Sequence, residues 1–178
     1  MNAKGDGVRN LELKVAVDNA AFVEIVRRAR RLGESRHLKQ IDTYFAVPSG
    51  RLKLREFTEG AVHSAELIGY SRPDQEGARW SEYYRAEFQP SQIAPMIAMM
   101  KKTIGVKTVV SKQREVIVTG RTRIHLDHVS NLGLFVELET VVGDDIGDTG
   151  AAEELAEVAA MLGLTAYPVI AGSYSDLI

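Results

Sequence analysis

Polar and apolar side chains alternate in several stretches of this chain, which is the repeat of a β-strand with one polar and one apolar face. In residues 10–15, Asn10, Glu12 and Lys14 alternate with leucine and valine. Further stretches place charged or titratable side chains two residues apart: Arg51, Lys53 and Arg55; Lys112 and Arg114; Arg123, His125 and Asp127; Glu137 and Glu139. Because these faces carry both signs of charge, we expect them to line an enclosed interior. An open sheet with its charged face in water is the alternative.

This pattern predicts eight strands and three helices. Strands are expected at residues 10–17, 38–47, 51–58, 64–72, 81–88, 106–118, 121–129 and 133–142. Helices are expected to follow caps at Asp18 or Asn19, at Ser91 and at Thr149, and to end at Gly33, Gly105 and Gly163. Short connections between successive strands favour antiparallel pairing. The predicted fold is therefore α+β, an eight-stranded antiparallel β-barrel that closes into a tunnel, with flanking helices.

Length, composition and net charge exclude several classes of protein. The 178 residues suit a single domain over residues 1–178, with residues 1–9 as a flexible leader. The absence of cysteine excludes disulfides, thiolate metal sites and a cysteine nucleophile. The formal net charge of −2 excludes a globally basic nucleic-acid binder but not a local basic cavity. Since no apolar run approaches the roughly 18 residues needed to span a bilayer, we expect a cytoplasmic protein with neither membrane nor nucleic acid as partner.

The charged faces carry the groups needed to bind a polyanion together with a metal ion. Glu12, Glu137 and Glu139 are oxygen ligands at strand spacing, and Asp127 is a fourth candidate that could instead orient an arginine. Buried together, these carboxylates repel one another unless a cation neutralises them, and Mg²⁺ or Mn²⁺ prefers such oxygen ligands. The bases that could converge on a chain of phosphates are Lys14, Lys53, Arg55, Arg72, Lys112, Arg114 and Arg123.

Several blocks of sequence, in order, resemble one known family. NLELK resembles the ExExK signature of the CYTH superfamily, the triphosphate tunnel metalloenzymes. The resemblance continues through QIDTYFAVPSGRLKLRE, VVSKQRE, RIHLDHVSNLGLFVELE and SYSDLI, and so covers residues 10–178. It implies an eight-stranded antiparallel tunnel that binds a triphosphate with a divalent metal. The superfamily includes class IV adenylyl cyclases, thiamine triphosphatases and inorganic tripolyphosphatases.

The resemblance also implies a role for each matching residue. It implies that the metal is held by Glu12, Glu137 and Glu139, with Asp127 beside them. The residues that it implies for triphosphate binding are Lys14, Lys53, Arg55, Arg72, Lys112, Arg114 and Arg123, of which Lys14, Lys112 and Arg114 are the implied catalytic residues. One position departs from the signature, because Asn10 stands where the family has its first Glu and removes one negative charge. The hairpin that carries Arg72 and Arg79 resembles the class IV cyclase-like subgroup.

The leading expectation is a class IV adenylyl cyclase-type enzyme that converts ATP to cyclic AMP and pyrophosphate. The alternatives are a hydrolase of tripolyphosphate, of nucleoside triphosphates or of thiamine triphosphate, and a binding module for polyphosphate or nucleotides. Thiamine triphosphate is disfavoured because no aromatic platform is evident among the charged strand positions. Trp80 is expected in a loop that covers the mouth of the barrel, and His125 is expected to be structural. The sequence leaves a homodimer open.

Overall fold

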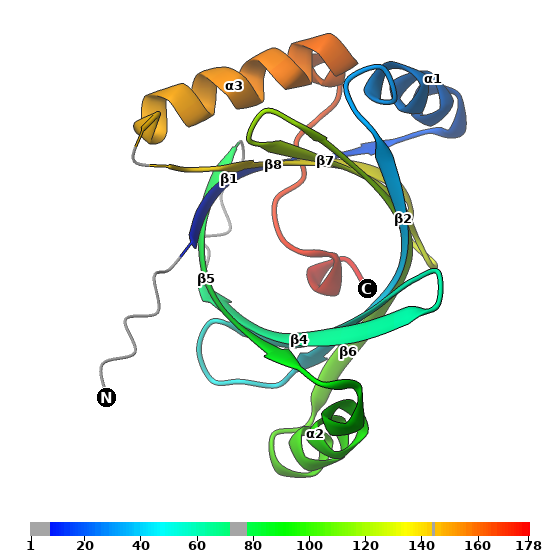
Figure 1. The fold of residues 1–178 in the computed structure, drawn as a ribbon, viewed down its shortest axis with the longest axis vertical. Helices are drawn as coiled ribbons and strands as arrows, with labels where there is room; N and C mark the ends of the chain where they lie inside the picture. Colours follow the sequence, from blue (N-terminus) through cyan, green and yellow to red (C-terminus); the bar gives the residue numbers. More distant parts are fainter. Residues whose placement is uncertain (1–7, 72–77, 144) are drawn as a thin grey trace.

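The fold is one antiparallel sheet with three helices on its outer side (Figure 1). The computed structural model describes residues 8–71, 78–143 and 145–178. The strands are β1 (Val8–Val17), β2 (Ser35–Phe45), β3 (Arg51–Glu59), β4 (Val62–Ser71), β5 (Arg79–Phe88), β6 (Val106–Thr119), β7 (Thr122–Val129) and β8 (Gly133–Val141). The helices are α1 (Asn19–Ala29), α2 (Pro90–Thr103) and α3 (Gly147–Leu162), with short 3-10 helices at Leu164–Ala166 and Tyr174–Asp176. The predicted α+β class with eight antiparallel strands and three helices is confirmed.

The strands follow one another round a ring in the order β1-β5-β4-β3-β2-β6-β7-β8. Strand β1 pairs with β5 on one side and with β8 on the other, so the pairing forms a closed barrel. The register places Glu12 of β1 opposite Glu139 of β8, and Lys14 opposite Glu137. Because side chains alternate between the two faces of a strand, this register brings both acidic and basic residues of β1 and β8 to the inside.

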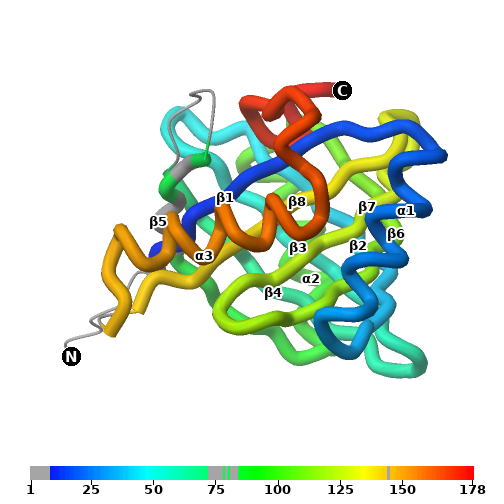
Figure 2. Tube along the Cα trace, turned by 90° about the horizontal axis from the view of Figure 1, so that it is seen from above, coloured from blue at the N-terminus to red at the C-terminus, as the bar shows by residue number. Residues whose placement is uncertain are grey.

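The apolar face of each strand points outward, against the helices. Leu11 and Val15 of β1 pack with Leu155 and Leu162 of α3 in the largest apolar cluster, which also contains residues of α1, β6, β7 and β8. Figure 2 shows α3 lying across β1 and β8. On the opposite side, Ile93 and Met100 of α2 cover a second cluster on β2, β3 and β4. The apolar core is therefore outside the barrel, which leaves the interior to the polar faces.

Several boundaries differ from the sequence prediction, among them the starts of β5, α2 and α3. Strand β5 begins at Arg79, because its pairing with β1 extends as far as the Glu12–Arg79 pair. Trp80 therefore lies in a strand and not in the predicted loop. Its ring packs against the apolar cluster outside the barrel, 4.8 Å from the Arg9 guanidinium, and does not line the mouth. Helix α2 is capped by Gln89 and begins at Pro90, which is favoured at the first helical position. Helix α3 begins at Gly147, ahead of the predicted cap.

The other helix signals agree with the sequence prediction, except that α1 ends at Ala29 with Arg30 as its C-cap, ahead of the predicted Gly33. The Asp18 carboxylate caps α1 by accepting from the Ala21 backbone N–H at 2.8 Å. Gly163 ends α3 with a φ of 76°, a left-handed conformation that glycine adopts without strain. None of the helices in the described part of the chain is long and apolar enough to cross a membrane.

Candidate functional site

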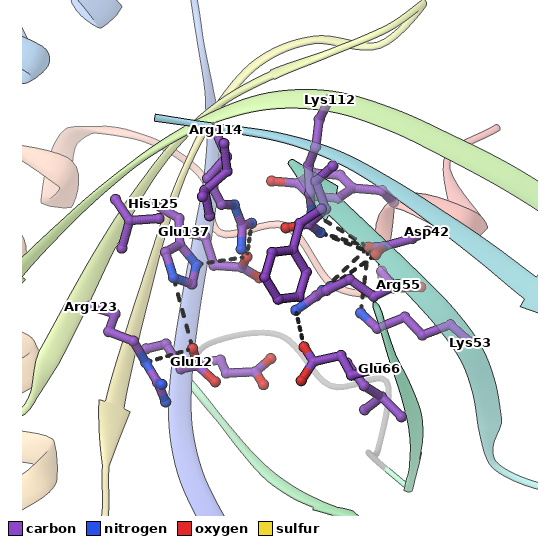
Figure 3. A pocket seen from close by; sticks show the side chains of 18 of the residues that line it. Glu12, Asp42, Lys53, Arg55, Glu66, Lys112, Arg114, Arg123, His125 and Glu137 are labelled. Carbon is purple, nitrogen blue, oxygen red and sulfur yellow. Dashed lines mark hydrogen bonds and ion pairs between the residues drawn. The ribbon is translucent and has the colours of Figure 1, made fainter. Parts of the chain in front are cut away.

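The interior of the barrel holds a cavity of about 350 Å³ to which every strand contributes side chains (Figure 3). One end is closed by the segment that carries Tyr174, which is 3% exposed and packs with Tyr44, Val110 and Phe135. The other end reaches solvent, because Arg36 lines the cavity and its side chain is 66% exposed. A substrate would therefore enter from the Arg36 end and meet a floor at Tyr174.

Asp42 is the centre of the first charged cluster. It is 1% exposed and pairs with Arg55 through Nε at 2.9 Å and Nη2 at 3.3 Å. Lys53 and Lys112 each place Nζ 3.6 Å from Oδ2, and Gln40 donates to both carboxylate oxygens. Burial by itself would raise the pKa of Asp42, but these cations outweigh it and hold the pKa well below its usual range. One buried carboxylate thus holds three bases together.

The second cluster is built on Asp127 and Glu137. Asp127 is fully buried and accepts both arms of the Arg114 guanidinium at 2.6 Å. Burial would raise its pKa, but Arg114 and Lys112 lower it to about 2. Glu137 accepts from Arg114 at 3.0 Å and lies 3.1 Å from Lys14 Nζ. Burial opposes the ionised form of Glu137 as well, and Lys14 is the strongest of the cations that nevertheless lower its pKa.

The third cluster lies nearer the open end. Glu139 is 3.1 Å from Arg123 Nε and accepts from the Asn10 side-chain amide. His125 lies between two carboxylates, with Nδ1 3.5 Å from Glu137 and Nε2 3.9 Å from Glu139. Burial and the charge of Arg114 lower the pKa of His125, so its ring is neutral at pH 7. Glu12 lines the same wall of the cavity.

Lys53 and Lys112, two lysines at the closed end, have unusually low pKa values. Burial and the neighbouring Arg55 lower the pKa of Lys53 to about 8. Burial and Arg114 lower that of Lys112 to about 7. Burial is the larger cause for both lysines, and an anion bound beside them would favour their charged forms.

An apolar strip lies on the wall near the open end. It consists of Leu38, Phe57 and Val116, which line the cavity on three adjacent strands. Leu38 precedes Tyr44 along β2 by a span of about 20 Å in an extended strand. The cavity therefore changes from charged at its closed end to partly apolar towards solvent. This strip was not predicted from the sequence, because single apolar residues on a polar face barely disturb the alternation of polar and apolar positions along a strand.

Most of the residues predicted for the site do line the cavity together: Glu12, Lys14, Lys53, Arg55, Lys112, Arg114, Arg123, Glu137 and Glu139. Arg72 lies outside the described residues, and Arg79 is placed only as the first residue of β5. Asp127 does not line the cavity, since Arg114 and Tyr174 occupy its two oxygens.

Sequence reasoning also missed functional candidates on other strands. Asp42 alternates with Gln40 and Tyr44 in β2, so strand spacing could have found it. Glu66 and Arg85, which lie 3.5 Å apart on β4 and β5, carry no comparable signal because their neighbours along the strand are mixed. His125 was predicted to be structural but lines the cavity.

The carboxylates supply the right donor atoms for a hard divalent cation, but within the described ranges no three carboxylate or histidine side chains meet as a preformed metal centre. Glu12 and Glu139 face each other in the β1–β8 register, and Glu137 follows on the same face of β8. Oxygen ligands of this kind suit Mg²⁺ or Mn²⁺. The residues therefore fit a metal once their present cationic partners turn to a phosphate.

The sequence matches the family model of the CYTH domain over residues 9–174. The chain belongs to the CYTH family. Enzymes of this family act on triphosphates together with divalent metal ions. The match covers the whole barrel and ends at Tyr174, so the floor of the cavity is part of the family domain.

Solved structures share the fold. The PH1012 protein of Pyrococcus horikoshii OT3 has a TM-score of 0.76 at 24% identity, covering 95% of this chain and 99% of that chain. A candidate adenylate cyclase of Vibrio parahaemolyticus has a TM-score of 0.69 at 18% identity, covering 97% and 98%. A candidate adenylyl cyclase of Hippeastrum, described as having a dominant triphosphatase activity, has a TM-score of 0.62 at 14% identity, covering 93% and 91%. No curated protein matched the sequence.

Proposed function

We propose that this CYTH protein is a metal-dependent enzyme that converts ATP to cyclic AMP and pyrophosphate, the class IV adenylyl cyclase reaction. The observation that carries the proposal is the gradient within one cavity. Bases crowd its closed end, carboxylates lie along the middle of its wall, and an apolar strip lies towards solvent. A triphosphate with an organic group at one end matches this gradient, because its charge would lie deepest and its base nearest the mouth.

The bases of the first two clusters would bind the phosphates. Lys14, Lys53 and Lys112 are compact charges at the closed end, suited to the terminal phosphate. Arg55 and Arg114 are held by Asp42 and Asp127, so their guanidinium groups are already oriented when the substrate enters. Preorganised cations of this kind cost little reorganisation during phosphoryl transfer.

Glu12, Glu137 and Glu139 would hold the metal ion. Glu139 lies beyond Phe135 along β8 by a span of about 13 Å, which puts it well away from the floor. The bound metal would neutralise charge on the phosphate oxygens and lower the pKa of a coordinated hydroxyl. For Asp127 the second of the two predicted roles is favoured, that of orienting an arginine, because both of its oxygens are already engaged by Arg114 and Tyr174.

The reaction proposed here is an in-line substitution at the α-phosphorus. The ribose 3′-oxygen forms the new bond to phosphorus, the bond to the bridging oxygen of the β-phosphate breaks, and the hydroxyl proton is released to solvent at the open end. Pyrophosphate leaves with the electron pair of the broken bond. The basic residues at the closed end would stabilise the charge that develops on it.

Hydrolysis of a triphosphate is the second candidate, and one observation favours it. The pKa of Lys112 is lowered to about 7, so near neutral pH a fraction of this lysine is neutral and could accept a proton from an attacking water. The Hippeastrum neighbour, described as having a dominant triphosphatase activity, makes the same reaction reasonable here.

Product analysis separates these functions. The protein is incubated with ATP, tripolyphosphate or thiamine triphosphate in the presence of Mg²⁺ or Mn²⁺, and cyclic AMP, pyrophosphate and orthophosphate are measured. Cyclic AMP with equimolar pyrophosphate is the expected result, and orthophosphate alone would establish hydrolysis instead. Binding without any product would identify a binding module. Glu139→Gln should abolish turnover, whereas the exposed control Lys101→Gln on α2 should not.

A further inference from the structure

One side chain of the closing segment contacts two of the lysines assigned to triphosphate binding and the carboxylate that holds Arg114. Tyr174 lies on the 3-10 helix Tyr174–Asp176, which enters the end of the barrel (Figure 1). Its hydroxyl donates to Asp127 Oδ2 at 2.7 Å, on the carboxylate that holds Arg114. Its ring lies 4.2 Å from Lys14 Nζ and 4.8 Å from Lys112 Nζ. The sequence alone gave this residue no role beyond closing one end.

Packing against neighbouring side chains fixes the position of the Tyr174 ring. Tyr174 packs edge-on against Phe135 with ring centroids 5.0 Å apart, and it is 3% exposed. A cation within about 6 Å of an aromatic face is attracted by the ring, and more strongly where water is excluded. The ring therefore adds a favourable surface for two buried lysines beside their carboxylate partners.

Asp176 holds the segment in place from the other side. Its carboxylate accepts from Arg51 at 2.9 Å, from Lys107 at 3.1 Å and from the Ser173 hydroxyl at 2.9 Å. Beyond the segment lies a second cavity of about 480 Å³, lined by Arg51, Lys107 and Ser175 among others. The segment is thus a thin partition, and without it the closed end of the first cavity would open towards that space.

We propose that Tyr174 is a positioning residue for triphosphate binding, which orients Arg114 through Asp127 and holds Lys14 and Lys112 against its ring. This inference rests on the proposed function. The Tyr174 hydroxyl holds the Asp127 carboxylate in place, so that the guanidinium group of Arg114 keeps its orientation towards the cavity. The ring closes the floor and keeps water from screening the lysine charges, which increases their attraction for a phosphate.

The test is the binding of inorganic tripolyphosphate to the whole chain, measured by calorimetry without divalent metal. Tyr174→Phe keeps the ring and removes only the hydroxyl, and we expect it to weaken binding about tenfold, the scale of one hydrogen bond to a charged group. Tyr174→Leu removes the ring as well and should weaken binding further. Tyr167→Phe is the matched control, since Tyr167 packs outside the barrel and its substitution should leave affinity unchanged.

A double-mutant cycle separates positioning from a merely structural effect. In the Arg114→Lys background the fork to Asp127 is lost, so Tyr174→Phe should cost little further affinity. A full tenfold loss in that background would overturn the proposed route through Arg114, and unchanged affinity of Tyr174→Phe would overturn the inference as a whole. Melting temperatures are recorded in parallel, so that every affinity is compared well below unfolding.

The same experiment distinguishes this inference from the function on which it rests. If the wild-type protein binds neither tripolyphosphate nor ATP, in the absence and in the presence of Mg²⁺, the proposed function fails and the inference fails with it. If the wild type binds and all variants bind equally, only the positioning role is wrong.

Discussion

Two buried carboxylates, each in contact with more than one base, allow the interior of the barrel to be charged. Asp42 contacts Arg55, Lys53 and Lys112, and Asp127 contacts Arg114 and Lys112. An ion removed from water is strongly destabilised unless partners and hydrogen bonds compensate it. The two aspartates therefore compensate four bases inside the protein, of which Lys53 and Lys112 have lowered pKa values. A polyanion would add the charge that the aspartates alone do not supply.

Lys112 should make triphosphate binding depend on pH. Because burial and Arg114 lower its pKa to about 7, Lys112 is mostly neutral at pH 9 and becomes protonated as the pH falls towards 7. A bound triphosphate favours the charged form, so we expect affinity for tripolyphosphate to rise over this range and protons to be taken up on binding. Calorimetry in buffers of different ionisation enthalpy measures this uptake. Lys112→Met should flatten the pH dependence; a dependence that persists in this variant would point to Lys53 instead.

Asn10 should stabilise the metal-free protein by its contact with Glu139. The Asn10 amide donates to this carboxylate, and Asn10 is fully buried. In Asn10→Glu the donor is replaced by a second buried negative charge, so we expect the free energy of unfolding to fall by about 1–3 kcal/mol. Thermal melts should show that Mn²⁺ restores more stability to the variant than to the wild type. Asn10→Gln, which keeps the amide, is the control, and equal melting of all three proteins without metal would contradict this account.

At the scale of elements, the two faces of the sheet have different roles. The outer face binds α1, α2 and α3 through apolar clusters, whereas the inner face presents charge. The alternation along β1 shows this division, since Leu11 and Val15 face α3 while Glu12 and Lys14 face the cavity. Changes under a helix should therefore alter stability and leave the site intact.

Leu155→Ala tests this separation. Leu155 of α3 is 3% exposed in the outer apolar cluster. Its truncation leaves a cavity and should lower the free energy of unfolding by about 2–5 kcal/mol. Tripolyphosphate affinity, measured by calorimetry below the lowered melting temperature, should remain that of the wild type. A parallel loss of affinity would show that α3 transmits strain through β1 to the cavity.

For the whole molecule, the charged interior predicts sensitivity to acid. The pKa of Asp127 is about 2 in the folded protein, whereas an aspartate in the unfolded chain titrates near 4. A carboxyl whose pKa falls on folding stabilises the protein above its unfolded pKa, and this contribution disappears as the pH falls through the folded pKa. Asp42 and Glu137, with pKa values also below their usual range, act in the same direction.

We therefore expect stability to fall steeply between about pH 4 and pH 2. Asp127 alone accounts for about 2 kcal/mol of this loss. Urea unfolding at a series of pH values measures the slope, which should be shallower in Asp127→Asn even though that variant is less stable at pH 7. Asp148→Asn, on an exposed surface pair with Arg9, should leave the slope unchanged. A slope that is the same in all three proteins would show that the interior carboxylates are not the groups that titrate.

The sequence alone was sufficient for the strand count and the antiparallel class, and most of the site residues that it predicts do line the cavity, because a strand assigns every second side chain to the same face. It could not place Trp80, since the extent of β5 is decided by its pairing with β1. It could not reveal that Asp42 holds three bases, because those bases come from β3 and β6, and only the strand pairing places both of these strands beside β2.

Local spacing thus determined which residues share a face of this CYTH protein, and the family blocks predicted the chemistry that they serve. Only the tertiary structure decided which charges are neighbours, that Asp127 orients Arg114, and that Tyr174 closes the floor of the cavity. The physical reason is that the face on which a side chain lies depends only on the two-residue repeat of its own strand. Proximity across a barrel depends instead on the register of all eight strands, and on a segment that enters the barrel from the far end of the chain.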